Sequence, residues 1–399
     1  MIDNIDYDRE SPFQPGVSVS PSKFRGRQET IVKILRYVNK AIKGETQHFF
    51  LTGNRRMGKT SVAEFVKYYA QVKFDMVGVY VSNKGNNSIE HLTSEIIEAI
   101  LNELPSQNLL SKIEELFKNH VEIIDLPGVK FKIKTDEITQ RSFKENFPDL
   151  LKELFAQFPE DKQGLFIVID DINGLSDSRE FADWYKKFAD TISVSDYYNL
   201  PVYMLLAGYP EKFDALVLHE ESFGSIFHRA NIGKLTDDEV DNFFTDIFNE
   251  NNITIDEEAL NLMIKFSSGL PLMMQQIGES IFWNINNNSI DIETAYKGIF
   301  SAANEISEKQ IKPILNILNS EDCNVIMNYL VENNLRKFKR EDLIENIEIS
   351  EKGLDTILSK MEKLDIIELI NNDTYSFINE LYYIYFLIKF EERKNNWKN

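Results

Sequence analysis

The sequence predicts an α/β protein with a parallel sheet, followed by a largely helical C-terminal region. Apolar runs of strand length recur through the first half of the 399-residue chain, separated by segments with helical periodicity. This alternation is typical of a parallel sheet with right-handed crossover connections. From Thr236 the strand-like runs stop and amphipathic helices follow one another. The expected core strands are Phe49–Thr52, Met76–Val81, Gly164–Asp171 and Pro201–Gly208.

The pattern divides the chain into four expected domains. Residues 1–23 contain Pro12, Pro15 and Pro21 and are interpreted as an extended lead-in. Residues 24–235 form the α/β core, with an insertion at about 105–160. The insertion would hold a charged helix over Leu109–His120, a β-like patch over Val129–Ile133 and a helix over Phe143–Phe158.

The C-terminal part is expected to hold a lid over 236–305 and a winged-helix domain over 306–399. The lid would consist of four helices, Asp237–Asn249, Glu257–Ser267, Leu272–Asn284 and Asp291–Ala303. Three further helices precede a hairpin and an aromatic helix, which is the winged-helix order: Glu321–Asn334, Arg340–Ile347, Glu351–Leu364, the hairpin Ile366–Phe377, and Leu381–Phe390.

Composition excludes several classes of protein. The chain carries 44 basic and 64 acidic residues, a net charge of −20, which opposes non-specific binding to nucleic acid. Cys323 is the one cysteine, so an internal disulfide and a cysteine-based zinc site are both excluded. No apolar run reaches the length of a membrane span, and the first residues do not resemble a signal peptide. We therefore expect a cytoplasmic protein without a membrane partner.

The strongest motif directly follows the first expected strand. It reads GNRRMGKTS over residues 53–61 and therefore fits GxxxxGKT, with an amphipathic helix after it. In such a loop the glycines let backbone N–H groups surround a polyphosphate, and the helix N-terminus faces the negative charge. Lys59 would reach the β- and γ-phosphates, and the Thr60 hydroxyl would bind Mg²⁺. The motif predicts binding of a nucleoside triphosphate.

A second motif supports the first, because LFIVIDD (165–171) is a buried strand that ends in two carboxylates. Asp170 is placed to bind Mg²⁺ through water, and Asp171 to orient the attacking water. Many proteins that combine such a strand with a P-loop carry Glu as the second of the two carboxylates. The Asp side chain found here is one methylene shorter.

Three other positions bear on the chemistry. Ala207 and Gly208 end a core strand where a polar residue facing the γ-phosphate is usual, with Tyr209 as a substitute or a rim tyrosine. Arg229 is interpreted either as an arginine finger or as a surface arginine. Gly269-Leu270-Pro271 opens a lid helix, with proline in its first turn.

Taken in order, these motifs resemble the archaeal and bacterial ATPase family within the STAND/AAA+ group of P-loop NTPases. The segments that carry the resemblance are FRGRQE (24–29), GNRRMGKTS (53–61), LFIVIDD (165–171), LLAGYP (205–210), FHRANIGKLTDDEV (227–240) and SSGLPLMMQQIGE (267–279). The RRxGKTS loop and the G-x-P motif are the most specific of them, and the resemblance covers residues 24–300 well.

The resemblance implies a set of site residues. The phosphates and Mg²⁺ would be held by Gly53, Gly58, Lys59, Thr60 and Ser61. The residues between the two glycines complete the candidate nucleotide site, comprising Asn54, Arg55, Arg56 and Met57. Of its two arginines, one is interpreted either as a contact to phosphate or to a neighbouring subunit, or as a solvated loop residue. Asp170 would assist the metal and Asp171 the water. Arg25, Gly26 and Arg27 would line the adenine side, which Pro271 would close.

Three functions fit these features. The favoured one is a molecular switch that binds ATP and ADP, hydrolyses ATP slowly, and passes its nucleotide state to a protein partner or to a second copy of itself. The alternative is a DNA-handling ATPase similar to archaeal replication initiators. Residues 318–399 hold 16 acidic and 11 basic residues, which disfavours DNA at the winged helix. A third function is ATP binding for stability alone, without turnover.

Overall fold

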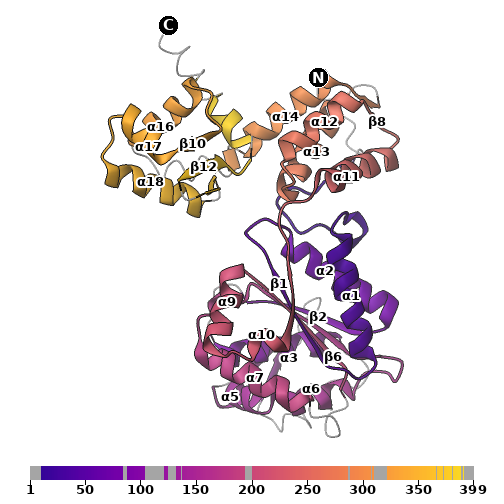
Figure 1. Cartoon of the computed structure of the whole chain (residues 1–399). Helices are drawn as coiled ribbons and strands as arrows, with labels where there is room; N and C mark the ends of the chain where they lie inside the picture. The colour runs from indigo at the N-terminus through magenta and orange to yellow at the C-terminus, as the bar shows by residue number, and fades with distance from the viewer. Residues whose placement is uncertain are drawn as a thin grey trace. The chain divides into compact units, whose positions relative to one another are not determined.

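Five parallel strands form the central sheet of residues 18–233 in the computed structural model (Figure 1). The strands are β1 Gln47–Thr52, β2 Val77–Ser82, β5 Leu165–Asp170, β6 Val202–Gly208 and β7 Phe227–Asn231, in the order β2-β5-β6-β1-β7. The predicted α/β class with a parallel sheet is confirmed. β7 is absent from the strands expected from sequence, because its FHRAN segment lacks an apolar run and is held as a strand by pairing with β1.

The structure describes residues 10–83, 88–103, 121–124, 132–135, 137–193, 200–285, 288–306, 308–309, 321–364, 366–371, 373–379, 381–387 and 390. The chain forms two compact units. One comprises Ser18–Gly233, and the other combines Met1–Val17 with Lys234–Asn399.

Helices cover both faces of the five-stranded sheet (Figure 1). Helices α1 (Gln28–Ile42) and α2 (Lys59–Phe74) contact one face. The other face carries α3 (Ile89–Glu103), α6 (Phe147–Phe155) and α7 (Arg179–Ser193). Residues on both sides of β5 and β6 are buried, which explains why these strands are continuous apolar runs. The remaining elements of the unit are η1 Pro21–Lys23, β3 Val121–Ile124, β4 Lys132–Thr135, α5 Glu137–Glu145, η2 Ile172–Gly174, α9 Pro210–His219 and α10 Phe223–Ile226.

The insertion differs from the sequence prediction where it is described. The single helix expected over Phe143–Phe158 is wrong, because α5 ends at Glu145 and α6 begins at Phe147. Pro148 lies in the first turn of α6, a position where proline starts a helix rather than continuing one. The β-like patch becomes an antiparallel pair of β3 with β4. The helix expected over Leu109–His120 lies outside the described residues.

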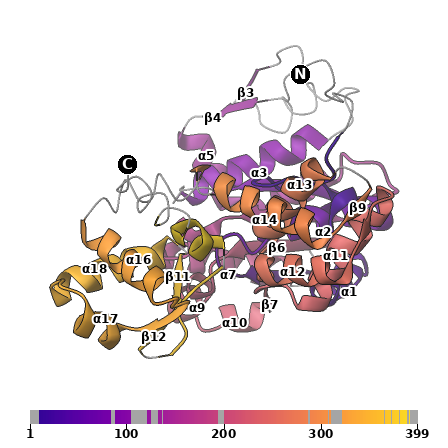
Figure 2. The ribbon, with the colours of Figure 1, turned by 90° about the horizontal axis from the view of Figure 1, so that it is seen from above.

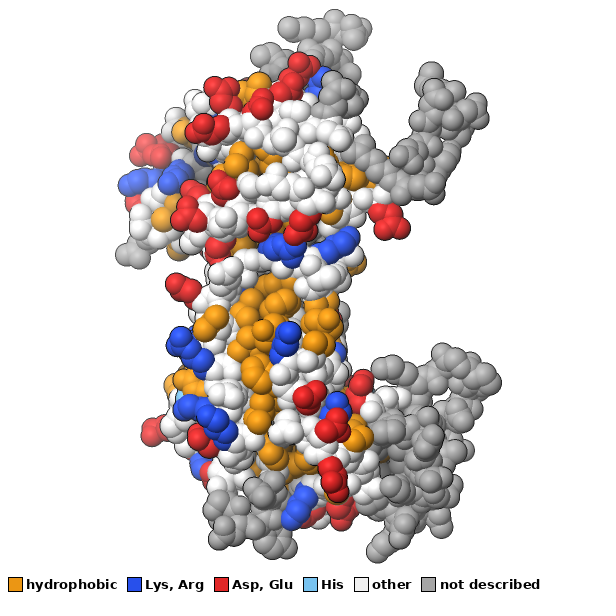
Figure 3. Space-filling model, turned by 90° about the vertical axis from the view of Figure 1, so that its right-hand side faces the viewer, with side chains coloured by type: hydrophobic (Ala, Val, Ile, Leu, Met, Phe, Trp, Pro, Cys, Tyr) orange, Lys and Arg blue, Asp and Glu red, His pale blue; other side chains and the backbone are white. Residues whose placement is uncertain are grey.

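The outer side of α1 and α2 retains apolar groups. Val32, Tyr68 and Val72 are exposed, and Figure 3 shows hydrophobic side chains gathered on one face of this unit. The rings of Phe24 and Phe65 stack 4.7 Å apart. This stacking fastens the segment before α1 to the helix that follows the P-loop.

The second unit begins with the helices expected for the lid. They are α11 Asp237–Glu250, α12 Glu257–Ser267, α13 Pro271–Asn284 and α14 Ile292–Ile306. Thr236 forms a capping box with Glu239 at the start of α11. The expectation that strands stop at Thr236 is wrong, because the short parallel strands β8 (Thr254–Ile255) and β9 (Ser289–Ile290) join the helix ends.

The described part of the lead-in is packed rather than free. Phe13 is buried, with its ring 5.2 Å from that of Phe248, and it faces Gly278 of α13. The backbone N–H of Gln14 donates to Gln275 at 2.7 Å. A side chain at position 278 would overlap Phe13, so this glycine makes room for the N-terminal segment.

The three helices and the hairpin expected over residues 321–377 are present, and residues 381–387 of the expected last helix are helical. Figures 1 and 2 show α16, α17 and α18 grouped around a small antiparallel sheet of order β10-β12-β11. The elements are α16 Glu321–Glu332, β10 Lys337–Lys339, α17 Arg340–Asn346, α18 Glu351–Lys363, β11 Ile367–Leu369 and β12 Thr374–Phe377. Asn379 connects this part to α12 by donating to the carbonyls of Phe266 and Ser267. The winged-helix assignment itself stays a prediction.

None of the helices in the described parts of the chain has the length and apolar character needed to cross a membrane.

His48 on β1 is a buried titratable group in the core of the P-loop unit. Its Nδ1 lies 2.8 Å from the Tyr185 hydroxyl, and the rings of Phe188 and Phe227 are within 6.3 Å. Burial, reinforced by the charge of His228, lowers the pKa of His48 from 6.5 to about 3. The imidazole is therefore neutral in the folded protein at neutral pH.

We predict that this histidine makes the P-loop unit sensitive to acid. Between pH 6.5 and 3 the unfolded chain takes up a proton that the folded chain does not, so stability is complete above pH 6.5 and falls by about 1.4 kcal/mol per pH unit below it. His48→Gln should reduce that slope, as measured by denaturant unfolding at pH 7, 6 and 5. If the dependence of the free energy of unfolding on pH were the same in the variant, His48 would not be a neutral buried imidazole. This holds whatever the variant's stability at pH 7.

Candidate functional site

The P-loop connects β1 to α2 through Gly53–Gly58. A Cβ added at Gly53 would lie 2.6 Å from the carbonyl oxygen of Ile232, so a larger residue does not fit there. Gly58 has φ +85°, a conformation that favours glycine, and α2 begins directly after it. These two constraints form a tight loop whose N–H groups and helix N-terminus together suit a phosphate.

Lys59 lies over this loop. Its Nζ donates to the carbonyl oxygens of Gly53 at 2.8 Å and Asn54 at 2.9 Å, and it lies 5.0 Å from the centroid of the Tyr209 ring. Tyr209, which follows β6, is therefore beside the P-loop lysine. A bound phosphate would offer the ammonium group a charged acceptor in place of two neutral carbonyls.

Asp170 at the end of β5 accepts hydrogen bonds from two hydroxyl groups. The Thr60 Oγ1 and the Tyr80 Oη both lie 2.6 Å from its Oδ2, and the backbone N–H of Asp171 donates to its Oδ1 at 2.9 Å. Burial raises the pKa of Tyr80 far above 10, and the neighbouring Asp170 carboxylate raises it further. The Tyr80 hydroxyl therefore stays protonated and donates to Asp170.

The oxygen atoms of Thr60 and Asp170 fit the donor set of Mg²⁺, which takes oxygen ligands, commonly one or two from protein and the rest from phosphates and water. Thr60 is in the first turn of α2, beside the loop that suits a phosphate. Thr60 would bind the ion through its hydroxyl, and Asp170 would hold one of the ion's water molecules.

Asp171 has left-handed backbone geometry, with φ +59°. Its Oδ1 accepts a hydrogen bond from the amide Nδ2 of Asn173, and the Oδ1 of Asn173 accepts one from the backbone N–H of Tyr209 at 2.9 Å. Asn173 thus connects the end of β5 to the end of β6. This connection fixes the Asp171 carboxylate close to the residue that contacts Lys59.

Arg229 lies within β7 and interacts with neighbours in its own unit. Its guanidinium carbon is 4.6 Å from the centroid of the Phe213 ring, and Nη1 lies 3.1 Å from Asp214 Oδ1. Its Nε donates to Thr52 Oγ1 at 3.4 Å, directly before the P-loop. To contact a phosphate, Arg229 would have to exchange its bond to Asp214 for one to the nucleotide.

The three residues that the sequence analysis expects on the adenine side precede α1. Arg27 is buried in left-handed geometry, and its Nη2 donates to the carbonyls of Met57, at 3.3 Å, and Gly233. Arg25 donates to the carbonyls of Ser22 and Phe24, both at 3.0 Å. Arg27 therefore connects the P-loop to the segment after β7, whereas Arg25, separated from it by Gly26, donates within the segment that precedes it.

The remaining predicted residues divide between the units. Asn54 and Arg55 are exposed at the tip of the loop, and Arg56 is left-handed at φ +65°. Ser61 accepts from the backbone N–H of Val19 at 3.3 Å. Pro271 belongs to the other unit, where it begins α13.

Tyr80 and Asn173 are site residues that sequence reasoning missed. Tyr80 lies in an apolar strand, where a tyrosine is expected to belong to the hydrophobic core. Only the pairing of β2 with β5 brings its hydroxyl to Asp170. Asn173 follows the two carboxylates closely, so its position was a usable signal. Its bond to the Tyr209 N–H depends on the adjacency of β5 and β6.

Comparisons with known proteins identify a matching domain and similar folds. Residues 23–182 match the model of the AAA ATPase domain. The chain is similar in fold to a Walker-type ATPase of Pyrococcus abyssi, with 15% identity, a TM-score of 0.53, and coverage of 91% of this chain and 96% of that one. It is also similar to the ORC2 protein of Aeropyrum pernix, solved as ADPNP–ADP complexes, with 11% identity, a TM-score of 0.55, and coverage of 96% and 97%. No curated protein matches the sequence. Residues 23–182 thus match the AAA ATPase domain, and the chain has a fold similar to that of P-loop ATPases.

We predict that Tyr80→Phe raises the Mg²⁺ concentration needed for nucleotide binding by about tenfold, because the hydrogen bond that orients the Asp170 carboxylate is lost. The measurement is a Mg²⁺ titration of fluorescent ATP-analogue binding. Tyr68→Phe, which removes a hydroxyl from an exposed position on α2, is the matched control and should leave the titration unchanged. Equal titrations for wild type and Tyr80→Phe would contradict this role.

Proposed function

We propose that the protein binds ATP with Mg²⁺ at the P-loop, hydrolyses it slowly, and acts as a nucleotide-dependent switch. The observation that carries the proposal is the convergence of Thr60 and Asp170 beside Lys59 at the start of α2. The similarity of residues 23–182 to the AAA ATPase domain supports it.

The described side chains suggest a division of work. Lys59 would leave the loop carbonyls and neutralise the β- and γ-phosphates, while Thr60 and Asp170 would hold Mg²⁺. Asp171 would orient the attacking water and accept its proton, and Asn173 would hold that carboxylate in place. Arg229 would act on the transition state only after releasing Asp214.

Slow turnover follows from two features of this site. Asp171 is shorter than the usual glutamate and is already bonded to Asn173. Ala207 and Gly208 place no polar side chain at the end of β6, where Tyr209 is the remaining polar group. A long-lived ATP state is what a switch requires, since a partner must meet the loaded form before hydrolysis.

In this proposal the second unit reports the nucleotide state. ATP would favour a closed arrangement with Pro271 on the adenine side, and hydrolysis or exchange would release it. A protein partner, or a second copy of the chain, would read the difference.

A DNA-handling ATPase is the second candidate, favoured by the three helices and the small sheet over 321–377. The charges in that region oppose it. Arg340 donates to Asp355 at 2.6 Å and also bonds Glu351, both on α18, and Lys339 pairs with Asp373 at 3.1 Å. The basic cluster near β10 is thus partly neutralised by acidic neighbours, which reduces its attraction for a phosphate backbone.

We predict that the protein releases phosphate from ATP slowly and with the same rate in the presence of duplex DNA. Lys59→Ala should lower that rate by about 100-fold because it removes a charge from the transferring phosphoryl group. Lys73→Ala, on the exposed side of the same helix, is the control. Marked stimulation by DNA would favour the second candidate.

The same Lys59→Ala protein separates a switch from an ATP held for stability. Hydrogen exchange across α13 should differ between ATP and ADP in wild type and lose that difference in the variant. The switch would be contradicted if hydrogen exchange in the wild type did not depend on the nucleotide and the variant differed from it only in lower stability.

We predict that Asp171→Asn lowers phosphate release by about 100-fold while ATP affinity stays within about twofold, since a general base acts on the chemical step. Single-turnover phosphate release and fluorescent-analogue binding measure the two effects. Asp183→Asn on the exposed side of α7 is the control. Unchanged release would assign the water-orienting role to another residue.

A further inference from the structure

β2 is an edge strand of the five-stranded sheet in the described part of the chain. Its partner in the sheet is β5. At the two ends of this pairing, the N–H of Val77 donates to the carbonyl of Gly164 and the N–H of Asn83 donates to the carbonyl of Asp170. In a strand, the N–H and C=O of one residue point to the same side, and successive residues alternate. Gly78, Tyr80 and Ser82 therefore direct their backbone groups to the open edge.

The hydrogen bonds at this edge agree with that geometry. The carbonyl of Gly78 accepts a bond from the Gln71 side chain at 3.4 Å, which shows its outward direction. No bond among the described residues engages the backbone N–H or C=O of Tyr80 and Ser82. An edge with such groups is a template for another extended chain.

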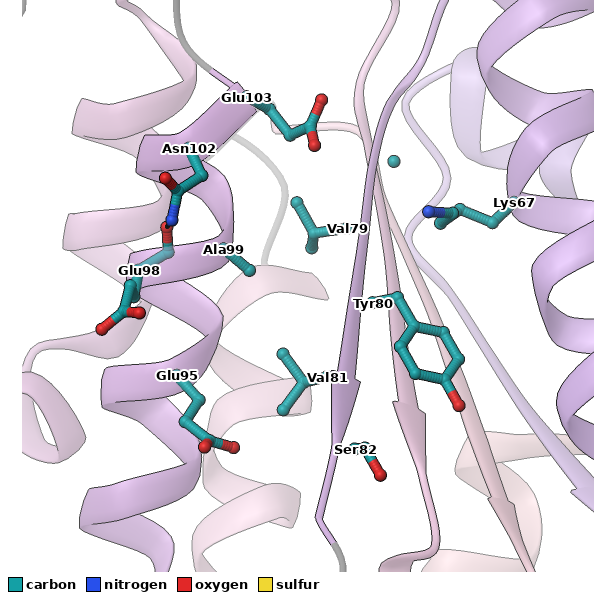
Figure 4. A pocket seen from close by; sticks show the side chains of 11 residues that line it. Lys67, Val79, Tyr80, Val81, Ser82, Glu95, Glu98, Ala99, Asn102 and Glu103 are labelled. Carbon is teal, nitrogen blue, oxygen red and sulfur yellow. Dashed lines mark hydrogen bonds between the residues drawn. The ribbon is translucent and has the colours of Figure 1, made fainter. Parts of the chain in front are cut away.

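The edge lies in a cavity of about 430 Å³ between α2 and α3 (Figure 4). In Figure 4, Val79 and Val81 point toward α3, whereas Tyr80 points toward the side of α2. The walls carry unlike charges, because α3 contributes Glu95, Glu98 and Glu103 and α2 contributes Lys67. The cavity therefore offers main-chain hydrogen bonds along its floor and a surplus of negative charge on one wall.

We propose that this groove, formed by the β2 edge and the facing sides of α2 and α3, binds an extended, lysine- or arginine-rich segment of a partner protein as an additional strand. Hydrogen bonds to Tyr80 and Ser82 would supply affinity without regard to sequence. The glutamates of α3 would select basic side chains on the same segment. An acidic segment would meet like charges and be rejected.

The test uses the full-length protein and a fluorescein-labelled peptide of about ten residues that alternates lysine with valine, since alternate side chains of an added strand face the same wall. Fluorescence anisotropy measures its dissociation constant. We expect binding at least about tenfold tighter than that of the matching glutamate–valine peptide. A version of the lysine peptide with N-methyl groups on alternate backbone nitrogens keeps its charge but cannot pair, and should lose at least about tenfold in affinity.

Protein variants locate the binding. Glu95→Gln combined with Glu98→Gln should weaken the lysine peptide by about tenfold, since charged wall groups are lost. Glu29→Gln combined with Glu153→Gln, at exposed positions on α1 and α6, removes the same charge elsewhere and should leave affinity unchanged. Equal binding of the N-methylated peptide, or equal losses in both double variants, would overturn the proposal in favour of general charge attraction. Absence of binding by the lysine peptide would also overturn it.

Discussion

The paired hydroxyl bonds to Asp170 hold the candidate site together. One carboxylate oxygen receives Thr60 from α2 and Tyr80 from β2, while Asp170 itself ends β5. Three elements that are distant in sequence are thereby fixed around a single charge. A buried carboxylate needs such donors, because burial without hydrogen bonds disfavours its charged form. The same donors would keep Asp170 in position when Thr60 turns toward a metal ion.

The tight loop before α2 is the second constraint on the site. Gly53 faces the Ile232 carbonyl too closely for a side chain, and the Arg27 guanidinium donates to the Met57 carbonyl. The P-loop is thus held between β7's end and the segment before α1. When a loop is already formed before binding, little of the nucleotide's binding free energy is lost in ordering the protein.

Sequence reasoning predicted the features that depend on local pattern. The parallel sheet followed from apolar runs, and the helices of the second unit followed from amphipathic periodicity. Features that depend on tertiary pairing were missed. β7 is a strand because β1 lies beside it, and Tyr80 belongs to the site because β2 pairs with β5. The break between α5 and α6 was recognisable from Pro148, and the expected single helix overlooked that signal.

β2 can take part in two kinds of interaction, because in a strand the side chains and the backbone hydrogen-bonding groups point in different directions. The Tyr80 side chain reaches Asp170, whereas the backbone of the same residue faces the open edge. Ser82 lies opposite Asp170 in the register and ends the strand. A chain added at the edge would therefore restrain the main chain of the residues that border the Asp170 carboxylate. Since α2 also borders the groove through Lys67, the helix that begins with the P-loop lysine and the strand that supports Asp170 form two sides of one surface.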